Sequence, residues 1–234
     1  MPIVESKVRR CEAVSEFVFV VELELPEPIS FVPGQYLMVV MGDGDMRPFS
    51  IASTPAETDF VELHIGATAD NPYAWEVIEK IRSEGKLTIN LPSGDAGYLA
   101  GSTRPLLLLA GGTGFSYTWS ILQAHLASDN KRPITLFWGG RKASDLYMHE
   151  ELQKLAVSDS RFHYVPVAEE VNSENWPGIR GLLIPAVLET VKNLTDYDVY
   201  IAGRFEMVRV ARDAFYAEGL PKEQLFGDAL AFIE

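Results

Sequence analysis

The residues RPFS, positions 47–50, place a cation, a ring and a hydroxyl group directly beside one another. Arg47 is the only Lys or Arg between Arg10 and Lys80, so it stands out in an acidic region. A cation and a hydroxyl this close together make the stretch a candidate for holding a polar ligand. The alternative is that Arg47 only forms a surface ion pair with a neighbour such as Asp45.

A glycine-rich loop, AGGTGFS at positions 110–116, follows a strongly apolar run and opens a helical pattern. Glycines let the backbone approach a phosphate closely, and the free amides of a helix N-terminus supply donors and partial positive charge. The loop does not match G-x-G-x-x-G, because position 117 is Tyr117, and it lacks the lysine of a P-loop. A tight strand-to-helix turn that needs glycine is the alternative interpretation.

The stretch YIAGRFEM, positions 200–207, repeats this arrangement later in the chain. Gly203 can admit a ligand against the strand end, and Arg204 and Met207 follow in the first helical turn. Ligands of open α/β sheets bind at the carboxyl ends of the strands. Two glycine-bearing strand ends in one sheet therefore predict a dinucleotide site.

The histidines indicate little chemistry. His64 lies in an alternating strand, where a histidine is more often structural than an acid or base. His125, His149 and His163 are far apart in the sequence and lack the spacing of metal ligands, so we expect no metal site.

The elements around these stretches change character near residue 100. One helix interrupts the first part, because Trp75, Ile78 and Ile81 recur at helical spacing. Segment 91–105 is rich in Gly, Ser and Pro, so we expect two domains, residues 1–101 and residues 102–234. Before it, four stretches separated by Pro, Gly and Asp predict short strands of an antiparallel barrel or sandwich: VSEFVFVVELEL, PGQYLMVVM, RPFSIAS and FVELHIG.

The second half of the chain alternates between strands and helices. PLLLLAGG (105–112) is a continuous apolar run, as a parallel strand buried on both faces requires. Strand and helix patterns then alternate four times, and LFGDALAFI (225–233) predicts a last strand. This order predicts a doubly wound parallel sheet. Trp119, Leu122 and Leu126 recur at helical spacing and are expected in the core.

The composition excludes several classes of protein. Hydrophobic residues make up 47% and charged residues 23% of the 234 residues, as in soluble globular proteins. The net charge of −13 argues against a nucleic-acid partner, and no apolar run approaches the ~18 residues of a membrane span. The N-terminus lacks the apolar core of a signal peptide, and the single Cys11 fits a reducing compartment, so we expect a cytoplasmic protein.

The motifs RPFS, AGGTGF and AGRFEM, in this order, resemble the ferredoxin-NADP reductase superfamily. Within it, the chain is similar to the bacterial NAD(P)H-flavin reductases related to those of luminous bacteria. The resemblance runs end to end, through GQYLMVVM, ELHIGA, WGGR, DVYIAGRFEM and LFGDA. It implies a six-stranded antiparallel flavin-binding β-barrel followed by a nicotinamide-binding α/β domain, which is the division already predicted above.

The resemblance also implies roles for single residues. Arg47 faces the ribityl or phosphate end of the flavin, Phe49 packs by its rings in place of the family's tyrosine, and Ser50 bonds near N5. Asp228 lies in the C-terminal segment over the active site, where it bonds a substrate or caps a turn, and Tyr36 is a flavin neighbour or ordinary core. The implied flavin-binding residues are Tyr36, Arg47, Pro48, Phe49, Ser50, Ile51, Ala52, His64, Ile65, Gly66 and Ala67, with Ser50 and Asp228 in catalysis. The implied nicotinamide-cofactor residues are Gly111, Gly112, Thr113, Gly114, Phe115, Ser116, Arg141, Gly203, Arg204, Phe205 and Met207.

Three departures from the family pattern bear on the reaction. Members that hold FAD permanently carry a Gly-and-Ser motif at a helix start, whereas this chain reads GATADNPYAWEV there, with Asp70 where a pyrophosphate would approach. Ala202 replaces the cysteine of electron-transferring relatives, so we expect a changed rate or nicotinamide position but not lost activity. Glu169 and Glu170 favour ribose hydroxyls over a 2′-phosphate, although Arg141 and Lys142 offer opposing charges.

We therefore expect hydride transfer from NADH, with NADPH tolerated, to free riboflavin or FMN, and less favourably FAD, followed by release of the reduced flavin. The nearest alternative is a reductase with tightly bound FAD that passes electrons to a protein partner. A non-enzymatic dinucleotide-binding regulatory subunit is a further alternative. We expect a monomer that acts on small molecules without a membrane or nucleic acid, and whose reduced flavin is used by a monooxygenase, a luciferase, ferric iron or several of these. The sequence does not identify the physiological acceptor.

Overall fold

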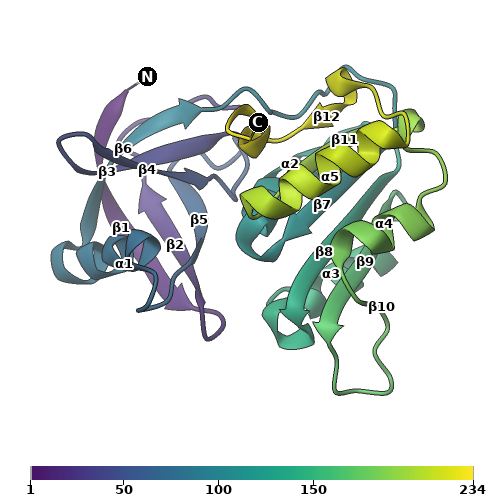
Figure 1. Cartoon of the computed structure of the whole chain (residues 1–234). Helices are drawn as coiled ribbons and strands as arrows, with labels where there is room; N and C mark the ends of the chain where they lie inside the picture. The colour runs from purple at the N-terminus through teal and green to yellow at the C-terminus, as the bar shows by residue number, and fades with distance from the viewer. Residues whose placement is uncertain (1, 234) are drawn as a thin grey trace. The chain divides into compact units, whose positions relative to one another are not determined.

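The computed structural model describes residues 2–233, which form two compact units (Figure 1). The first unit holds the chain up to Tyr98 together with Trp119–Ala124, and the second holds Leu99–Thr118 together with the chain from His125 onward. The chain thus first passes from the first unit to the second between Tyr98 and Leu99, and one segment of α2 belongs to the first unit again. The division into domains expected at residues 101 and 102 stays a prediction.

The first unit contains a six-stranded antiparallel sheet, drawn in purple and blue in Figure 1. Its strand order is β4-β3-β6-β1-β2-β5. Helix α1 (Pro72–Glu84) connects β5 to β6 and packs its buried Val77, Ile78 and Ile81 into the core of the unit. The strands are β1 (Ile3–Ala13), β2 (Val18–Glu24), β3 (Tyr36–Gly42), β4 (Asp45–Ser50), β5 (Phe60–Gly66) and β6 (Lys86–Ser93).

The sheet curves until its two ends meet. β1 pairs with β6 through its first half and with β2 through its second half. Directly after β4, the amide of Ala52 donates to the carbonyl of Glu62 in β5 (2.7 Å), and the amide of Glu62 donates to Ser53 Oγ (3.0 Å). Apolar side chains fill the interior. The predicted antiparallel barrel is therefore confirmed.

Two barrel strands, β1 and β6, are absent from the stretches that the sequence patterns indicated. β1 hides its alternation because its one fully buried side chain is polar: Ser6, whose hydroxyl donates to the carbonyl of Glu24. β6 does alternate, with Leu87, Ile89 and Leu91 buried in the core. A search for runs of apolar residues therefore undercounts the strands of this barrel.

The second unit contains a parallel sheet with the order β10-β9-β8-β7-β11-β12. The strand order reverses direction between β7 and β11, which is where open α/β sheets bind ligands. Helices α4 and α5 pack together against the sheet through one apolar cluster. The strands are β7 (Leu106–Gly111), β8 (Ile134–Lys142), β9 (Phe162–Glu170), β10 (Ile179–Arg180), β11 (Asp198–Ala202) and β12 (Leu225–Phe226); the helices are α2 (Phe115–Ala127), α3 (His149–Ser158), α4 (Leu183–Thr190) and α5 (Phe205–Ala217).

The four strand–helix alternations predicted from the sequence are confirmed, as is the doubly wound parallel sheet. The prediction of a long last strand over 225–233 is wrong. Only Leu225 and Phe226 pair with β11, and Asp228–Ala231 form a 3-10 turn instead. Gly227 lies against the carbonyl of Ile201, where any side chain would overlap it, so the chain turns at this close approach.

Candidate functional site

The predicted flavin-binding stretch lies on β4, which is a terminal strand in the order of the barrel sheet. Tyr36 in β3 is directly opposite Ser50 in β4, and both side chains are half-buried. Within residues 2–233 the Ser50 hydroxyl has no hydrogen-bond partner, so it is available to a ligand. Pro48 is exposed, whereas Phe49 contacts the barrel core. Because neighbouring side chains alternate across a strand, a ring that touches both Phe49 and Ser50 must lie along the edge of β4.

Arg47 is nearly buried, with 9% of its side chain exposed, and it binds two carboxylates. Its Nε donates to Asp45 Oδ1 (2.9 Å), and its Nη2 donates both to Asp45 Oδ2 (2.6 Å) and to Glu76 Oε2 in α1 (2.7 Å). Nη1 donates to the carbonyl of Tyr73, and the guanidinium lies over the Tyr73 ring, 5.0 Å from its centre. The hydrogen bonds that Arg47 donates to Asp45 raise the pKa of Arg47, and they lower the pKa of the Asp45 carboxyl. The ion pair with Asp45, which was the alternative to ligand binding, is present.

The β5 part of the predicted flavin site contains a buried histidine. His64 Nε2 lies 2.9 Å from Glu62 Oε1, and the His64 side chain is 1% exposed. Ile65 and Ala67 are buried in the barrel core, and Gly66 is half-buried. Burial and an internal carboxylate partner suit a structural role for His64, as its position in an alternating strand indicated.

Residues of α2 that belong to the first unit hold the chain directly after the RPFS motif. Ser120 Oγ donates to the carbonyl of Ser53 (2.7 Å), and Gln123 Nε2 donates to the carbonyl of Ala52 (2.9 Å). Ser120 is fully buried. Side chains far away in the sequence thus hold the backbone that directly follows Ser50 and Ile51.

The predicted nucleotide loop follows β7, and its glycines differ in what surrounds them. A side chain at Gly114 would overlap the carbonyl of Ala202, and one at Gly111 or Gly203 would come within 2.5 Å of Met207. Gly114 is therefore needed for the close packing of two strand ends, as the tight-turn alternative held, and the φ of +155° at Gly203 favours glycine, whereas the flexible end of Met207 can move aside for a side chain at Gly111. Gly112 is different: its φ is +54°, and nothing lies within 4 Å of an added Cβ. Open space at Gly112 beside the start of a 13-residue helix fits the phosphates of a dinucleotide.

Side chains behind the loop hold it in place. Trp138 Nε1 donates to the carbonyl of Gly112 (2.9 Å), and the buried Phe115 stacks on Trp138 with ring centres 4.0 Å apart. Ser116 is also buried, so Phe115 and Ser116 can offer only backbone groups to a ligand, whereas Thr113 is half-buried. At the second strand end Met207 packs on the glycines, and Arg204 and Phe205 are exposed at the start of α5.

Arg141 near the end of β8, which was predicted to bind the nicotinamide cofactor, forms an ion pair with Glu170 at the end of β9. Arg141 Nε lies 2.7 Å from Glu170 Oε1, and both side chains are largely exposed. This contact raises the pKa of Arg141. The next acidic residue, Glu169, is exposed beside it. The carboxyl end of β9 thus carries two carboxylates, one of which already pairs with Arg141.

Two further acidic residues were singled out in the sequence, one for catalysis and one for its position where a pyrophosphate would approach. Asp228 is half-buried at the start of the last 3-10 turn, and its charge contributes to the raised pKa of the fully buried Tyr117, after burial itself. Asp70 is exposed just before α1, and a hydrogen bond from the Thr68 side chain lowers the pKa of its carboxyl. A fixed anion at this helix start opposes the binding of a second anion.

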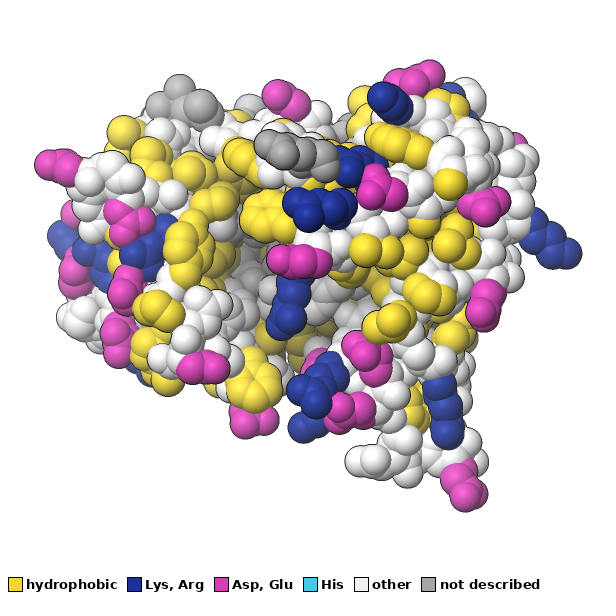
Figure 2. Space-filling view, viewed as in Figure 1, with side chains coloured by type: hydrophobic (Ala, Val, Ile, Leu, Met, Phe, Trp, Pro, Cys, Tyr) yellow, Lys and Arg dark blue, Asp and Glu magenta, His cyan; other side chains and the backbone are white. Residues whose placement is uncertain are grey.

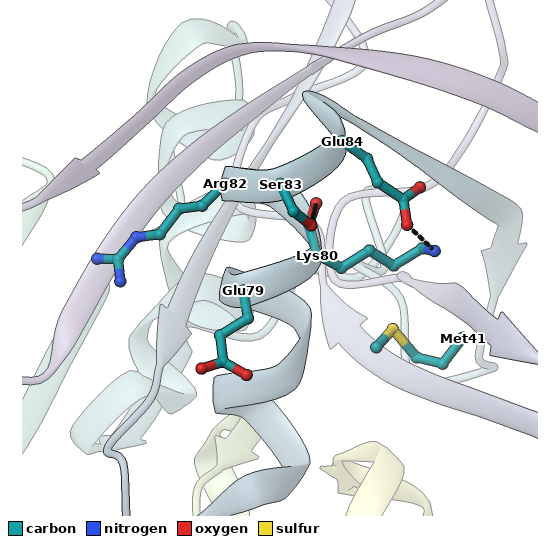
Figure 3. Close-up of a pocket in the computed structure, with 6 residues that line it drawn as sticks. All are labelled: Met41, Glu79, Lys80, Arg82, Ser83 and Glu84. Carbon is teal, nitrogen blue, oxygen red and sulfur yellow. Dashed lines mark hydrogen bonds and ion pairs between the residues drawn. The ribbon is translucent and has the colours of Figure 1, made fainter.

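A hollow in the first unit lies away from these stretches. It is an open depression of about 640 Å³, lined by the last turns of α1 and by Met41 (Figure 3). Lys80 and Glu84, one turn apart on α1, pair beside it at 2.8 Å, and none of the predicted site residues line it. Within residues 2–233, no group of three or more His, Cys, Asp or Glu is arranged to hold a metal ion. No helix in that range is long and apolar enough to cross a membrane.

On the face shown in Figure 2, Lys and Arg side chains stand among Asp and Glu side chains.

Sequence reasoning missed several residues around these stretches. Glu76 and Tyr73 bind Arg47 from a helix that follows it by more than twenty residues, and Ser120 and Gln123 bind the chain after RPFS from still farther away. Trp138 supports the nucleotide loop from the neighbouring strand. None of these pairings follows a short sequence motif, because each depends on how the elements pack.

Comparisons with known proteins show the family and the fold of the chain. Residues 108–213 match the family model of the oxidoreductase NAD-binding domain. An NAD(P)H-flavin reductase of Aliivibrio fischeri is 46% identical over the full length of both chains, and one of Vibrio harveyi is 44% identical over 98% of this chain and 99% of its own. In fold, the ferredoxin reductase of carbazole 1,9a-dioxygenase is similar with a TM-score of 0.85 at 24% identity, over 97% of this chain and 70% of that one. The chain belongs to the NAD(P)H-flavin reductase family.

Proposed function

We propose that this protein transfers hydride from NADH, with NADPH tolerated, to free riboflavin or FMN, and that the reduced flavin leaves as a product. The observation that carries the proposal is the full-length identity of 46% to an NAD(P)H-flavin reductase, with all three motifs in place. The exposed Asp70 at the start of α1 supports a dissociable flavin, because it opposes the pyrophosphate of FAD.

The residues of the chain bind and orient two planar substrates. The chemistry is carried by the substrates themselves: hydride passes from C4 of the nicotinamide to N5 of the flavin. Ser50, whose hydroxyl has no partner among residues 2–233, donates to N5, while Tyr36, Phe49 and the edge of β4 hold the flavin rings. Gly112 and the first amides of α2 bind the pyrophosphate of the dinucleotide, and the nicotinamide lies near Gly203, against which Met207 packs. Held at near-attack distance, ~3–3.5 Å, the rings react without a protein nucleophile.

The acidic end of β9 supports NADH as the preferred donor. Glu170 already neutralises Arg141, and Glu169 adds a further negative charge. Carboxylates at this position suit the ribose hydroxyls of NADH and repel the 2′-phosphate of NADPH.

The proposal includes the oligomeric state of the protein, its compartment and the acceptor of its reduced flavin. The chain works as a monomer in the cytoplasm, where its single Cys11 stays reduced, and its reduced flavin supplies an acceptor such as a monooxygenase or luciferase.

The test is to desalt the purified protein and follow the loss of NADH absorbance with and without added riboflavin or FMN. Oxidation that appears only with free flavin, and that saturates with flavin concentration, is the expected result. Fast oxidation by desalted protein together with a yellow, flavin-retaining sample would favour the bound-FAD reductase. Binding of NADH without any oxidation would favour the regulatory subunit.

A further inference from the structure

We propose that Asp45 and Glu76 are specificity-determining residues, which keep Arg47 from recruiting the phosphate of a phosphorylated flavin. The inference rests on the proposed function, in which the flavin lies against β4. It goes beyond that function by assigning the discrimination between riboflavin and FMN to two carboxylates. Both contacts are short: Arg47 Nη2 lies 2.6 Å from Asp45 and 2.7 Å from Glu76.

The hydrogen-bond donors of Arg47 are almost all used within the protein. A guanidinium has five N–H donors. Asp45 takes two of them, Glu76 takes one and the carbonyl of Tyr73 takes one, which leaves a single N–H on Nη1. A strong arginine–phosphate contact is bidentate and needs two neighbouring donors. Arg47 cannot offer such a pair while both carboxylates stay in place.

The net charge of Arg47, Asp45 and Glu76 also disfavours the binding of a phosphate. One cation and two carboxylates give the cluster a net charge of −1, in a stretch of 100 residues that carries 7 Lys and Arg against 16 Asp and Glu. A phosphomonoester such as that of FMN carries about −1.5 to −2 at neutral pH. Riboflavin has the same rings and no phosphate, so this cluster repels FMN and leaves riboflavin unaffected.

A purely structural role makes a different prediction. If Asp45 only stabilises the β3–β4 hairpin and Glu76 only fastens α1 to the barrel, removing their charges changes the binding of both flavins equally. Discrimination requires that the two dissociation constants move apart. The ratio of the FMN to the riboflavin dissociation constant is therefore the quantity to measure.

The experiment measures both constants by quenching of flavin fluorescence, without NADH, in the intact protein. The variants are Glu76→Gln and the double substitution Asp45→Asn with Glu76→Gln. The matched control is Glu79→Gln, one helical turn further along α1, whose carboxylate accepts from Trp75 Nε1 and is visible in Figure 3. Each protein is titrated at low and at high salt, because screening weakens interactions between exposed charges.

We expect the ratio to fall about 3- to 10-fold in Glu76→Gln at low salt, and further in the double variant, while riboflavin binding and Glu79→Gln stay near the wild type. Salt should lower the ratio in the wild type, where it screens repulsion, and raise it in the double variant, where it screens attraction. An unchanged ratio in both variants, with riboflavin still bound, overturns the inference and leaves the proposed function intact. Failure of the wild type to bind either flavin overturns the proposed function and the inference with it.

Discussion

Arg141 in β8 and Glu170 in β9 form an ion pair of 2.7 Å at the carboxyl ends of two neighbouring strands of the parallel sheet. The side chains are 75% and 48% exposed, so the pair is open to solvent and to a ligand. It places a carboxylate on the cation that would otherwise attract a 2′-phosphate.

Removing that carboxylate should increase the use of NADPH. In Glu170→Gln, Arg141 is released, and we expect kcat/KM for NADPH relative to NADH to rise about two- to fivefold. Steady-state kinetics with both donors at low salt measure the ratio, and Glu174→Gln, in the loop after β9, serves as the control. An equal change for the two donors would show that Glu170 takes no part in the choice of donor.

Loss of the Ser50 hydroxyl should slow hydride transfer without harming the fold. We expect Ser50→Ala to lower kcat roughly 10- to 100-fold, or about 1.4–2.7 kcal/mol of barrier, because a donor to flavin N5 is gone. The melting temperature should not change, since the hydroxyl has no partner within residues 2–233. Wild-type turnover in this variant would contradict the assigned role.

Two glycines of the nucleotide loop should differ when they are replaced by alanine: Gly114→Ala should mainly lower the free energy of unfolding, and Gly112→Ala should mainly weaken NADH binding. Gly114→Ala forces a methyl group against the carbonyl of Ala202, so we expect a loss of about 1–3 kcal/mol in the free energy of unfolding. Gly112→Ala meets no protein atom within 4 Å and costs only about 1–2 kcal/mol of left-handed strain, but it should raise KM for NADH about tenfold. Denaturant unfolding and NADH titration on both variants check this. A KM for NADH in Gly112→Ala equal to that of the wild type would remove Gly112 from the binding site.

His125 should make the second unit less stable in mild acid. Its side chain is fully buried, and its Nε2 donates to the carbonyl of Arg132 (2.9 Å). Burial lowers the pKa of His125, opposed by that hydrogen bond and reinforced by the charges of Arg132 and Arg161. Because the folded pKa is below the unfolded one, the neutral histidine contributes stability above pH ~6.5, and this contribution is lost as the pH falls through the folded pKa.

Unfolding by denaturant at pH 7.5 and pH 5.5 measures this contribution. We expect the free energy of unfolding to fall less in His125→Gln than in the wild type, while the exposed His163→Gln behaves as the wild type. An identical fall in all three proteins would place the acid sensitivity elsewhere.

Periodicity predicted most of the fold, because the elements are long and their burial is regular. Strand β5 has the bounds of the predicted stretch FVELHIG, and the helical spacing of Ile78 and Ile81 corresponds to their burial in α1. The failures have physical reasons. β1 buries a serine instead of an apolar residue, and the chain after Phe226 turns where Gly227 lies against the carbonyl of Ile201.

The surroundings of the candidate site could not be predicted in the same way. The sequence singled out Arg47 and the nucleotide glycines by type and spacing. It did not show that Glu76 would neutralise Arg47, because that contact joins β4 to a helix 29 positions later. It also did not show which glycine is open to a ligand and which are packed against Ala202 or Met207, because the packing depends on the register of β7 and β11.

The central claim is that reduced flavin leaves the protein, and its release can be measured directly. The protein is mixed without oxygen with NADH and riboflavin, both in large molar excess, and the solution is passed through a membrane that retains the protein. The account predicts reduced riboflavin in the filtrate, in an amount that exceeds the protein many times over. Reduced flavin that stays with the protein, at no more than one per chain, would contradict it.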